Sequence, residues 1–138
     1  MFKSCRTSAV CAAAVLGMLA GCAATPDRTA RPAAMNAAQP DIELLGFPGC
    51  PNTPAMRANL KAALTAVGKG WTVKDTNQEQ LPEGDLRRGY PTPTILVNGR
   101  DLYGLPVPTA PGMGCRLYAG GVPDVQDIAS KLKTAAEK

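Results

Sequence analysis

The stretch Gly46–Leu60, GFPGCPNTPAMRANL, joins an apolar run to a segment with helical periodicity. It places Cys50 between a glycine and a proline, with Thr53 three residues later. We expect Cys50 at the helix N-cap and Pro51 at the first helical position, where free backbone N–H groups and the positive helix end point at the sulfur. These groups stabilise a thiolate, which is the reactive form in thiol exchange and in soft-metal binding. Thr53 is expected to donate its hydroxyl to the same sulfur. The alternative is a half-buried cysteine that only packs.

The segments around this stretch predict the order strand, helix, strand, helix, strand, strand, helix. Apolar runs predict the strands and 3.6-residue periodicity predicts the helices. Asn98-Gly99 indicates a hairpin turn, because both central residues of that turn need positive φ. We expect strands at 42–45, 71–74, 94–97 and 100–103, and helices at 56–67, around 78–88 and at 125–132.

The first 22 residues have the pattern of a bacterial export signal. A positively charged start precedes the apolar run Ala9–Ala20, which is too short to span a bilayer comfortably. The run ends in Leu19-Ala20-Gly21-Cys22, which resembles the lipobox of bacterial lipoproteins. The resemblance implies a lipoprotein signal peptide over residues 1–21. The alternative is an ordinary secretory signal with an incidental cysteine.

The same resemblance implies that Cys22 is the lipidated first residue of the mature protein. Several acyl chains, palmitate among them, anchor a protein far more firmly than a single chain does. Ala23 at the next position implies the outer membrane, with the protein facing the periplasm. Residues 22–40 are rich in Ala, Pro and small polar residues and are expected to form a disordered tether. The remaining residues, 41–138, suffice for one modest domain.

The charge and cysteine contents exclude several classes of function. The chain has 15 basic and 11 acidic residues, and 13 basic residues remain without Lys3 and Arg6. This nearly balanced charge does not indicate a nucleic-acid-binding protein, because such a protein requires a clustered basic face. No histidine is present, so histidine metal sites, Ser-His-Asp triads and Cys-His pairs are excluded. After signal removal and lipidation of Cys22, only Cys50 and Cys115 remain as thiols, in a compartment where such a pair tends to bond.

The expected element order and three motifs resemble the thioredoxin-like family. The motifs are a cysteine at a helix start in Gly49–Thr53, Pro93-Thr94 before the third strand, and a β-hairpin followed by a closing helix. The resemblance implies a thioredoxin-like three-layer α/β fold over residues 41–138, with a central mixed sheet of about four strands. The chain departs from the family pattern because Thr53 replaces the second cysteine. Ordinary dithiol exchange within the motif is therefore out of reach.

The resemblance also assigns roles to two residues before the third strand. It implies that Pro93 is cis, packs against Cys50, shapes the site and excludes misdirected metals. Thr92 would offer its backbone to an extended substrate strand. Gly49–Pro54 together with Cys115–Tyr118 also resembles small bacterial thioredoxin-like proteins that are sometimes grouped with alkylmercury lyases.

Residues 104–122 form an insert that is far longer than the connection this fold requires. The strand after the predicted hairpin turn returns toward the edge that carries Cys50, so the insert begins close to that cysteine. It carries Cys115, and Gly112 and Gly114 permit a close backbone approach. Folded over the site as a lid, the insert would bring Cys115 to Cys50. The alternative is that Cys115 stays free or pairs with another protein.

The leading hypothesis is a membrane-anchored periplasmic thiol–disulfide oxidoreductase. Cys50 would attack a partner disulfide and Cys115 would resolve the mixed disulfide, with protein or small-molecule thiols as partners. A second hypothesis is a non-catalytic binding module in which a Cys50–Cys115 bond only closes a loop of about 65 residues, worth about 3–4 kcal/mol. We expect a monomer with no cofactor, no hard-metal site and no nucleic-acid partner.

A third hypothesis is a protein that binds soft metals. Two facing thiolates near Met113 suit Cu(I) or Hg(II) rather than Zn(II), Mg(II) or Ca(II). Cleavage of an organomercurial would further require an acid that protonates the leaving carbon. Asp101 on the returning hairpin strand is the nearest candidate, and its position one residue before Leu102 is compatible with the opposite face of the sheet.

Overall fold

The computed structural model of the chain describes residues 39–137. The predicted signal peptide over 1–21, the predicted lipidation site Cys22 and nearly all of the predicted tether lie outside the described residues. Within the described part, no helix is both long enough and apolar enough to cross a membrane. The described part begins at Gln39, whose side-chain amide donates a 2.7 Å hydrogen bond to the Thr72 hydroxyl.

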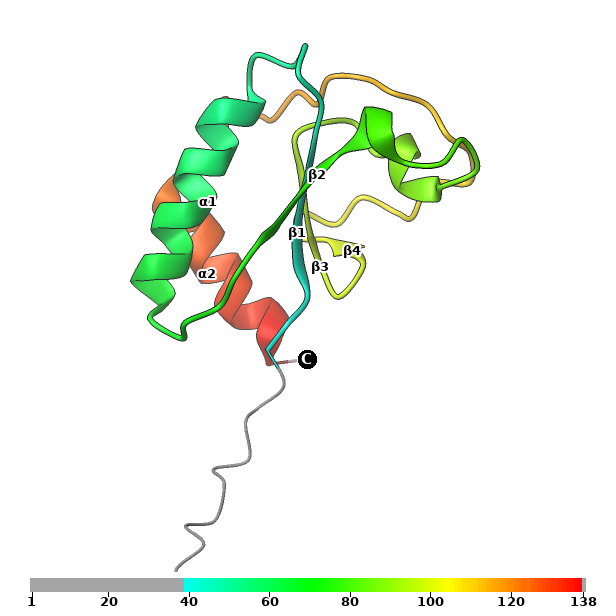
Figure 1. The fold of residues 1–138 in the computed structure, drawn as a ribbon. Coiled ribbons are helices and arrows are strands. Elements are labelled where there is room, and N and C mark those ends of the chain that lie inside the picture. The colour runs from blue at the N-terminus through cyan, green and yellow to red at the C-terminus, as the bar shows by residue number, and fades with distance from the viewer. Residues whose placement is uncertain (1–38, 138) are drawn as a thin grey trace, which may run out of the picture. The chain divides into compact units, whose positions relative to one another are not determined.

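Four strands form one mixed sheet in the order β2-β1-β3-β4 (Figure 1). Strand β1 pairs in parallel with β2 and antiparallel with β3, and β3 pairs antiparallel with β4. The predicted thioredoxin-like α/β fold with a four-stranded mixed sheet is therefore confirmed. The strands are β1 (Ile42–Gly46), β2 (Lys74–Asn77), β3 (Thr94–Val97) and β4 (Arg100–Asp101).

Helices α1 (Thr53–Val67) and α2 (Val125–Ala136) lie side by side on one face of this sheet (Figure 1). Helix α1 ends at Gly68, which adopts φ 69° as its C-cap. Helix α2 begins at Asp124, whose carboxylate accepts from the backbone N–H groups of the first turn. The apolar faces of both helices meet the sheet in the main core, which contains Ile42, Leu44, Met56, Leu60, Ala63, Leu64, Ile95, Val97, Ile128, Ala129 and Leu132.

The opposite face of the sheet is covered by irregular structure. A helix was predicted around 78–88, and the structure instead has two short 3₁₀ helices, η1 (Gln78–Gln80) and η2 (Leu86–Gly89). Pro82 and Gly84 lie between them and disfavour a continuous α-helix. The insert runs along this side, drawn in yellow to orange in Figure 1. A Cβ at Gly89 would lie 2.3 Å from the Ala110 carbonyl oxygen, so the insert packs directly on η2.

Two strand boundaries differ from the sequence prediction. The second strand was predicted at 71–74 and lies at Lys74–Asn77, because β2 is an edge strand whose residues are mostly polar and of which only Thr76 is buried. Trp71 and Val73 instead pack against the core just before the strand. Strand β4 ends at Asp101 rather than at residue 103.

The predicted hairpin turn is confirmed. Asn98 and Gly99 both have positive φ, 51° and 76°, and form the turn between β3 and β4.

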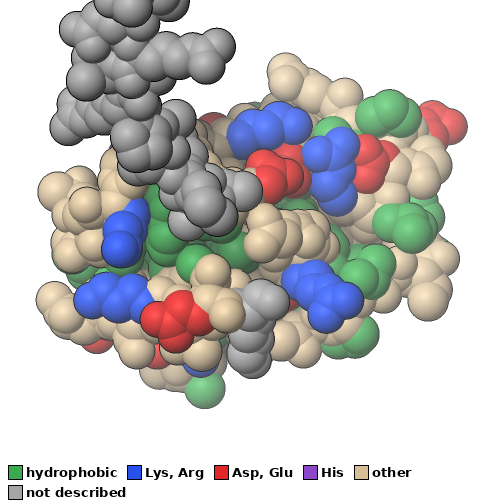
Figure 2. All heavy atoms as spheres, turned by 90° about the horizontal axis from the view of Figure 1, so that it is seen from below, with side chains coloured by type: hydrophobic (Ala, Val, Ile, Leu, Met, Phe, Trp, Pro, Cys, Tyr) green, Lys and Arg blue, Asp and Glu red, His purple; other side chains and the backbone are tan. Residues whose placement is uncertain are grey.

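Figure 2 shows one face of the molecule, on which basic and acidic side chains lie next to one another. This mixture agrees with the nearly balanced composition of the chain.

Candidate functional site

Cys50 lies in the loop between β1 and α1 and is only 2% exposed. Its N–H donates to the Phe47 carbonyl at 3.1 Å, and its own carbonyl accepts from the Thr53 N–H at 3.3 Å. These bonds form a turn that leads directly into α1. The N-cap of α1 is Asn52, so the expectation that Cys50 itself occupies the N-cap was wrong by two residues. The backbone N–H groups of Asn52 and Thr53 nevertheless donate toward the Cys50 sulfur.

Thr53 is the first residue of α1 and lies beneath the Cys50 loop. Its side chain is buried against Gly46, where an added Cβ would lie 2.6 Å from the Thr53 Cγ2. Among the described residues, its Oγ1 is one of three buried side-chain polar atoms that have no hydrogen-bond partner of ordinary geometry. The same hydroxyl lies near enough to Cys50 to lower the pKa of its thiol. A buried hydroxyl without another partner is therefore available to the thiolate.

The loop before β3 contacts the Cys50 sulfur from the other side. The Thr92–Pro93 peptide bond is cis, as the family resemblance implied. Thr92 is fully buried, and its carbonyl oxygen accepts from the Cys50 thiol at a sulfur–oxygen distance of 3.3 Å. The family resemblance implied that the Thr92 backbone binds an extended substrate strand. In the structure, the insert instead forms hydrogen bonds with the backbone N–H and carbonyl groups of Thr92.

The insert pairs with Thr92 as a short parallel β-bridge centred on Cys115. The Thr92 N–H donates to the Gly114 carbonyl at 2.8 Å, and the Arg116 N–H donates to the Thr92 carbonyl at 2.7 Å. This pairing brings Cys115 close enough to Cys50 for each thiol to shift the pKa of the other, although 65 positions separate them in the chain. Both cysteines are free thiols in this structure, with Cys50 buried and Cys115 exposed.

The pKa values of the two thiols move in opposite directions. Burial opposes ionisation of Cys50, but hydrogen bonds from the Thr53 hydroxyl, from two backbone N–H groups and from Cys115 together lower its pKa. Desolvation, the negative charge of Cys50 and the hydrogen bond to Cys50 raise the pKa of Cys115. Cys50 is therefore the first of the two to become a thiolate as the pH rises.

Arg116 holds the insert beside this pair. Its guanidinium donates to both carboxylate oxygens of Asp101, at 2.7 and 3.0 Å, and to the Thr94 hydroxyl at 2.9 Å. It also lies over the Tyr118 ring at 4.4 Å, and the Tyr118 hydroxyl donates to the Pro93 carbonyl at 2.8 Å. The side chains of Arg116 and Asp101 are 8% and 0% exposed, so this is a buried ion pair.

The contacts of Asp101 bear on the metal hypothesis. Its carboxylate accepts from Arg116 and also from the backbone N–H groups of Tyr103 and Leu105, so its oxygens are engaged in holding the insert. Residues 39–137 contain no group of three or more His, Cys, Asp or Glu side chains placed to hold a metal ion. The two thiols remain as the soft ligands, while Met113 is exposed.

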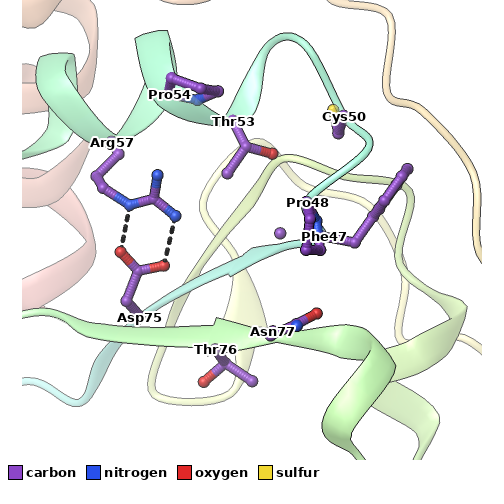
Figure 3. Close-up of a pocket in the computed structure, with 10 residues that line it drawn as sticks. Phe47, Pro48, Cys50, Thr53, Pro54, Arg57, Asp75, Thr76 and Asn77 are labelled. Carbon is purple, nitrogen blue, oxygen red and sulfur yellow. Dashed lines mark hydrogen bonds and ion pairs between the residues drawn. The ribbon is translucent and has the colours of Figure 1, made fainter.

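A cleft of about 210 Å³ opens beside Cys50, between the loop, the first turn of α1 and β2 (Figure 3). Cys50 and Thr53 lie at one end. At the other end Arg57 makes a two-pronged ion pair with Asp75, drawn with dashed lines in Figure 3. Phe47 and Pro48 line the cleft on the Cys50 side, away from the ion pair (Figure 3).

Comparisons of the chain with family models, with curated proteins and with solved structures found no match. The structure brings Cys50, Thr53, Thr92 and Cys115 together, with Pro93 directly after Thr92. Cys22 lies outside the described residues.

Sequence analysis missed three residues of this region: Arg57, Asp75 and Arg116. The position of Arg57 one helical turn after Thr53 was a usable signal, because residues four apart share a helix face. The position of Arg116 directly after Cys115 was another.

Proposed function

We propose that this protein carries out thiol–disulfide exchange, with Cys50 as the nucleophile and Cys115 as the resolving thiol. The observation that carries the proposal is the shared contact at Thr92, whose carbonyl accepts from the Cys50 thiol while its backbone pairs with the segment around Cys115. One residue thus contacts the Cys50 thiol and pairs with the backbone on both sides of Cys115, which supports disulfide exchange between these two cysteines. Their opposite pKa shifts support the division of roles, because the thiolate is the attacking species.

The reaction conserves atoms and electrons. The Cys50 thiolate attacks one sulfur of a disulfide RSSR, forms a mixed disulfide with it and expels RS⁻. The Cys115 thiol loses its proton and attacks the Cys50 sulfur, which forms the Cys50–Cys115 bond and expels a second RS⁻. Protons from the two protein thiols end on the two released thiols, and two electrons pass from the protein to RSSR. The reverse sequence oxidises two small thiols.

A redox titration with thiol alkylation and mass detection tests this proposal. We expect a Cys50–Cys115 bond that forms and breaks reversibly at potentials above about −300 mV. A bond that stays oxidised well below that potential would be a structural staple, which is the alternative of a non-catalytic binding module. Failure to form any intramolecular bond under oxidising conditions would remove the role of Cys115.

We propose further that lipid at Cys22 anchors this activity to the outer membrane on its periplasmic side. The support is the resemblance of Leu19–Cys22 to a lipobox. Fractionation of cells that express the full chain tests it. Cys22→Ser should move the protein out of the membrane fraction, while Cys50→Ser, the matched control, should stay with the membrane. Equal distribution of the two variants would contradict the anchor.

A further inference from the structure

The two ends of the cleft beside Cys50 carry different kinds of side chain. One end holds the Cys50 and Thr53 side chains, including the buried Thr53 hydroxyl that has no ordinary partner among the described residues. The other end holds the charged pair Arg57–Asp75. A molecule that fills the cleft therefore meets the nearly buried Cys50 at one end and both signs of charge at the other.

The size of the cleft and the pairing of Thr92 favour a small substrate. A volume of about 210 Å³ lies below the range of about 300–1,000 Å³ that accepts drug-sized ligands. An extended polypeptide would need free backbone groups beside the sulfur, and both groups of Thr92 are bonded to the insert at 2.8 and 2.7 Å. The buried Arg116–Asp101 pair fixes the insert in that position.

The Arg57–Asp75 pair is available to a ligand because it is exposed. The two side chains are 37% and 44% exposed, and exposed ion pairs contribute little to stability. Arg57 uses Nε and Nη2 toward Asp75, which leaves both N–H groups of Nη1 free to bind a carboxylate. The Asp75 oxygens retain lone pairs that accept from an ammonium group.

Helix geometry sets the spacing between this charged pair and Thr53, which lines the cleft together with Cys50. Thr53 and Arg57 are four residues apart on α1, so they lie on the same face about one turn, ~5.4 Å, apart along the helix axis. In an amino acid with a side-chain sulfur, the carboxylate and the ammonium both branch from a carbon close to that sulfur. Because Cys50 and Arg57 line the same cleft, a ligand sulfur at Cys50 would leave these groups inside the cleft that also holds Arg57.

We propose that the cleft selects small zwitterionic thiols and disulfides of the amino-acid type, with Arg57 binding the carboxylate and Asp75 the ammonium. This specificity rests on the exchange function proposed above and follows the same balanced steps, with the amino-acid disulfide as RSSR. Arg57 and Asp75 act as specificity-determining residues, since neither reaches the reacting sulfurs in the bond exchange itself.

The test compares four symmetric disulfides as oxidants of the reduced protein: L-cystine, bis(2-hydroxyethyl) disulfide, 3,3′-dithiodipropionate and cystamine. Loss of free thiols is followed by alkylation and mass. We expect L-cystine to react about ten-fold or more faster than the hydroxyethyl compound after correction for their intrinsic reactivity toward a free model thiol.

Arg57→Gln should lower the cystine-to-hydroxyethyl rate ratio about ten-fold. Asp75→Asn should lower the same ratio and raise the rate with the dianionic dithiodipropionate, because it releases the guanidinium.

Arg100→Gln is the matched control, because Arg100 is an exposed arginine on β4 that does not line the cleft. It should leave all four rates unchanged. Equal corrected rates for the four disulfides, or loss of the preference in Arg100→Gln as in Arg57→Gln, would overturn the specificity and leave exchange intact. Absence of oxidation by every disulfide would overturn the exchange function and the specificity with it.

Discussion

Two arginine–aspartate pairs flank the same cysteine and differ mainly in burial. Arg116–Asp101 lies under the insert with side chains 8% and 0% exposed, whereas Arg57–Asp75 lines the open cleft with side chains 37% and 44% exposed. Both pairs join two guanidinium nitrogens to two carboxylate oxygens. The two pairs use the same chemical groups, and they differ in how far water reaches them.

The difference separates a structural role from a binding role. A buried pair that loses one partner leaves an uncompensated charge, so its integrity holds the insert and Cys115 in place. An exposed pair is screened by water and exchanges partners at little cost, so it is suited to a ligand. Cys50 therefore has a fixed side, where the insert carries Cys115, and a side next to the cleft, where we propose that an external disulfide enters.

The largest expected effect comes from breaking the buried pair. Arg116→Ala should lower the free energy of unfolding by about 3–5 kcal/mol, because the buried Asp101 carboxylate loses its oppositely charged partner. Urea denaturation followed by circular dichroism measures this. Arg57→Ala is the control and should cost less than about 1 kcal/mol. Equal losses in the two variants would erase the distinction drawn between the pairs.

A smaller loss of stability is expected from crowding the cleft side. Gly46→Ala places a Cβ 2.6 Å from the Thr53 Cγ2, so the side chain or the backbone must move, at about 1–3 kcal/mol. The same movement should displace the Thr53 hydroxyl and slow alkylation of Cys50. Gly84→Ala, where an added Cβ meets no atom within 4 Å, is the control for both readouts. A Gly46→Ala protein with normal stability would show that this contact relaxes freely.

Removal of the Thr53 hydroxyl should change reactivity rather than stability. Thr53→Val keeps the shape of the side chain and removes a buried donor that lowers the pKa of Cys50. The pH profile of Cys50 alkylation should shift to higher pH, and its rate at pH 7 should fall about five-fold, the equivalent of one hydrogen bond of ~1 kcal/mol. Thr65→Val on the exposed side of α1 should leave the profile in place. An unshifted profile in Thr53→Val would assign the lowered pKa of Cys50 to the backbone N–H groups and to Cys115.

The smallest effect is expected at a third pair of intermediate exposure, Arg87–Asp85. Hydrogen bonds from Arg87 lower the pKa of Asp85 from 3.8 to about 2. The stabilisation from a lowered carboxyl pKa is present above pH 3.8 and is lost as the pH falls toward 2. Asp85→Asn should remove this part of the acid dependence, worth less than about 1 kcal/mol at this exposure. Identical acid denaturation curves from pH 4 to pH 2 would contradict it.

Local signals made much of the fold predictable from the sequence. Apolar periodicity identified both α-helices and the two central strands, and Asn98-Gly99 identified the hairpin. Strand β2 was misplaced because an edge strand needs few apolar residues, so the apolar residues before it gave the stronger signal. The segment around Pro82 was misassigned because polar residues with moderate helix propensity outweighed its two helix-breaking residues.

The parts of the site that depend on one residue and its sequence neighbours were predictable. The parts that join residues distant in the sequence were less predictable. Cys50 and Thr53 stand at a recognisable junction, and topology directed the insert toward them. The two arginine–aspartate pairs join residues 18 and 15 positions apart, and no local pattern specifies such partners. The register of Cys115 on Thr92 depends on the path of the whole insert, which turn residues alone do not fix.

The most direct test of the account is the identity of the first cysteine to react. Reduced protein is mixed with a limiting amount of L-cystine, quenched with acid after milliseconds to seconds, and mapped by mass. The account predicts an early cysteinyl adduct on Cys50, which decays as the Cys50–Cys115 bond forms, and a stable Cys50 adduct in Cys115→Ser. An early adduct on Cys115, or a Cys50→Ser protein that reacts as fast as Cys115→Ser, would contradict it.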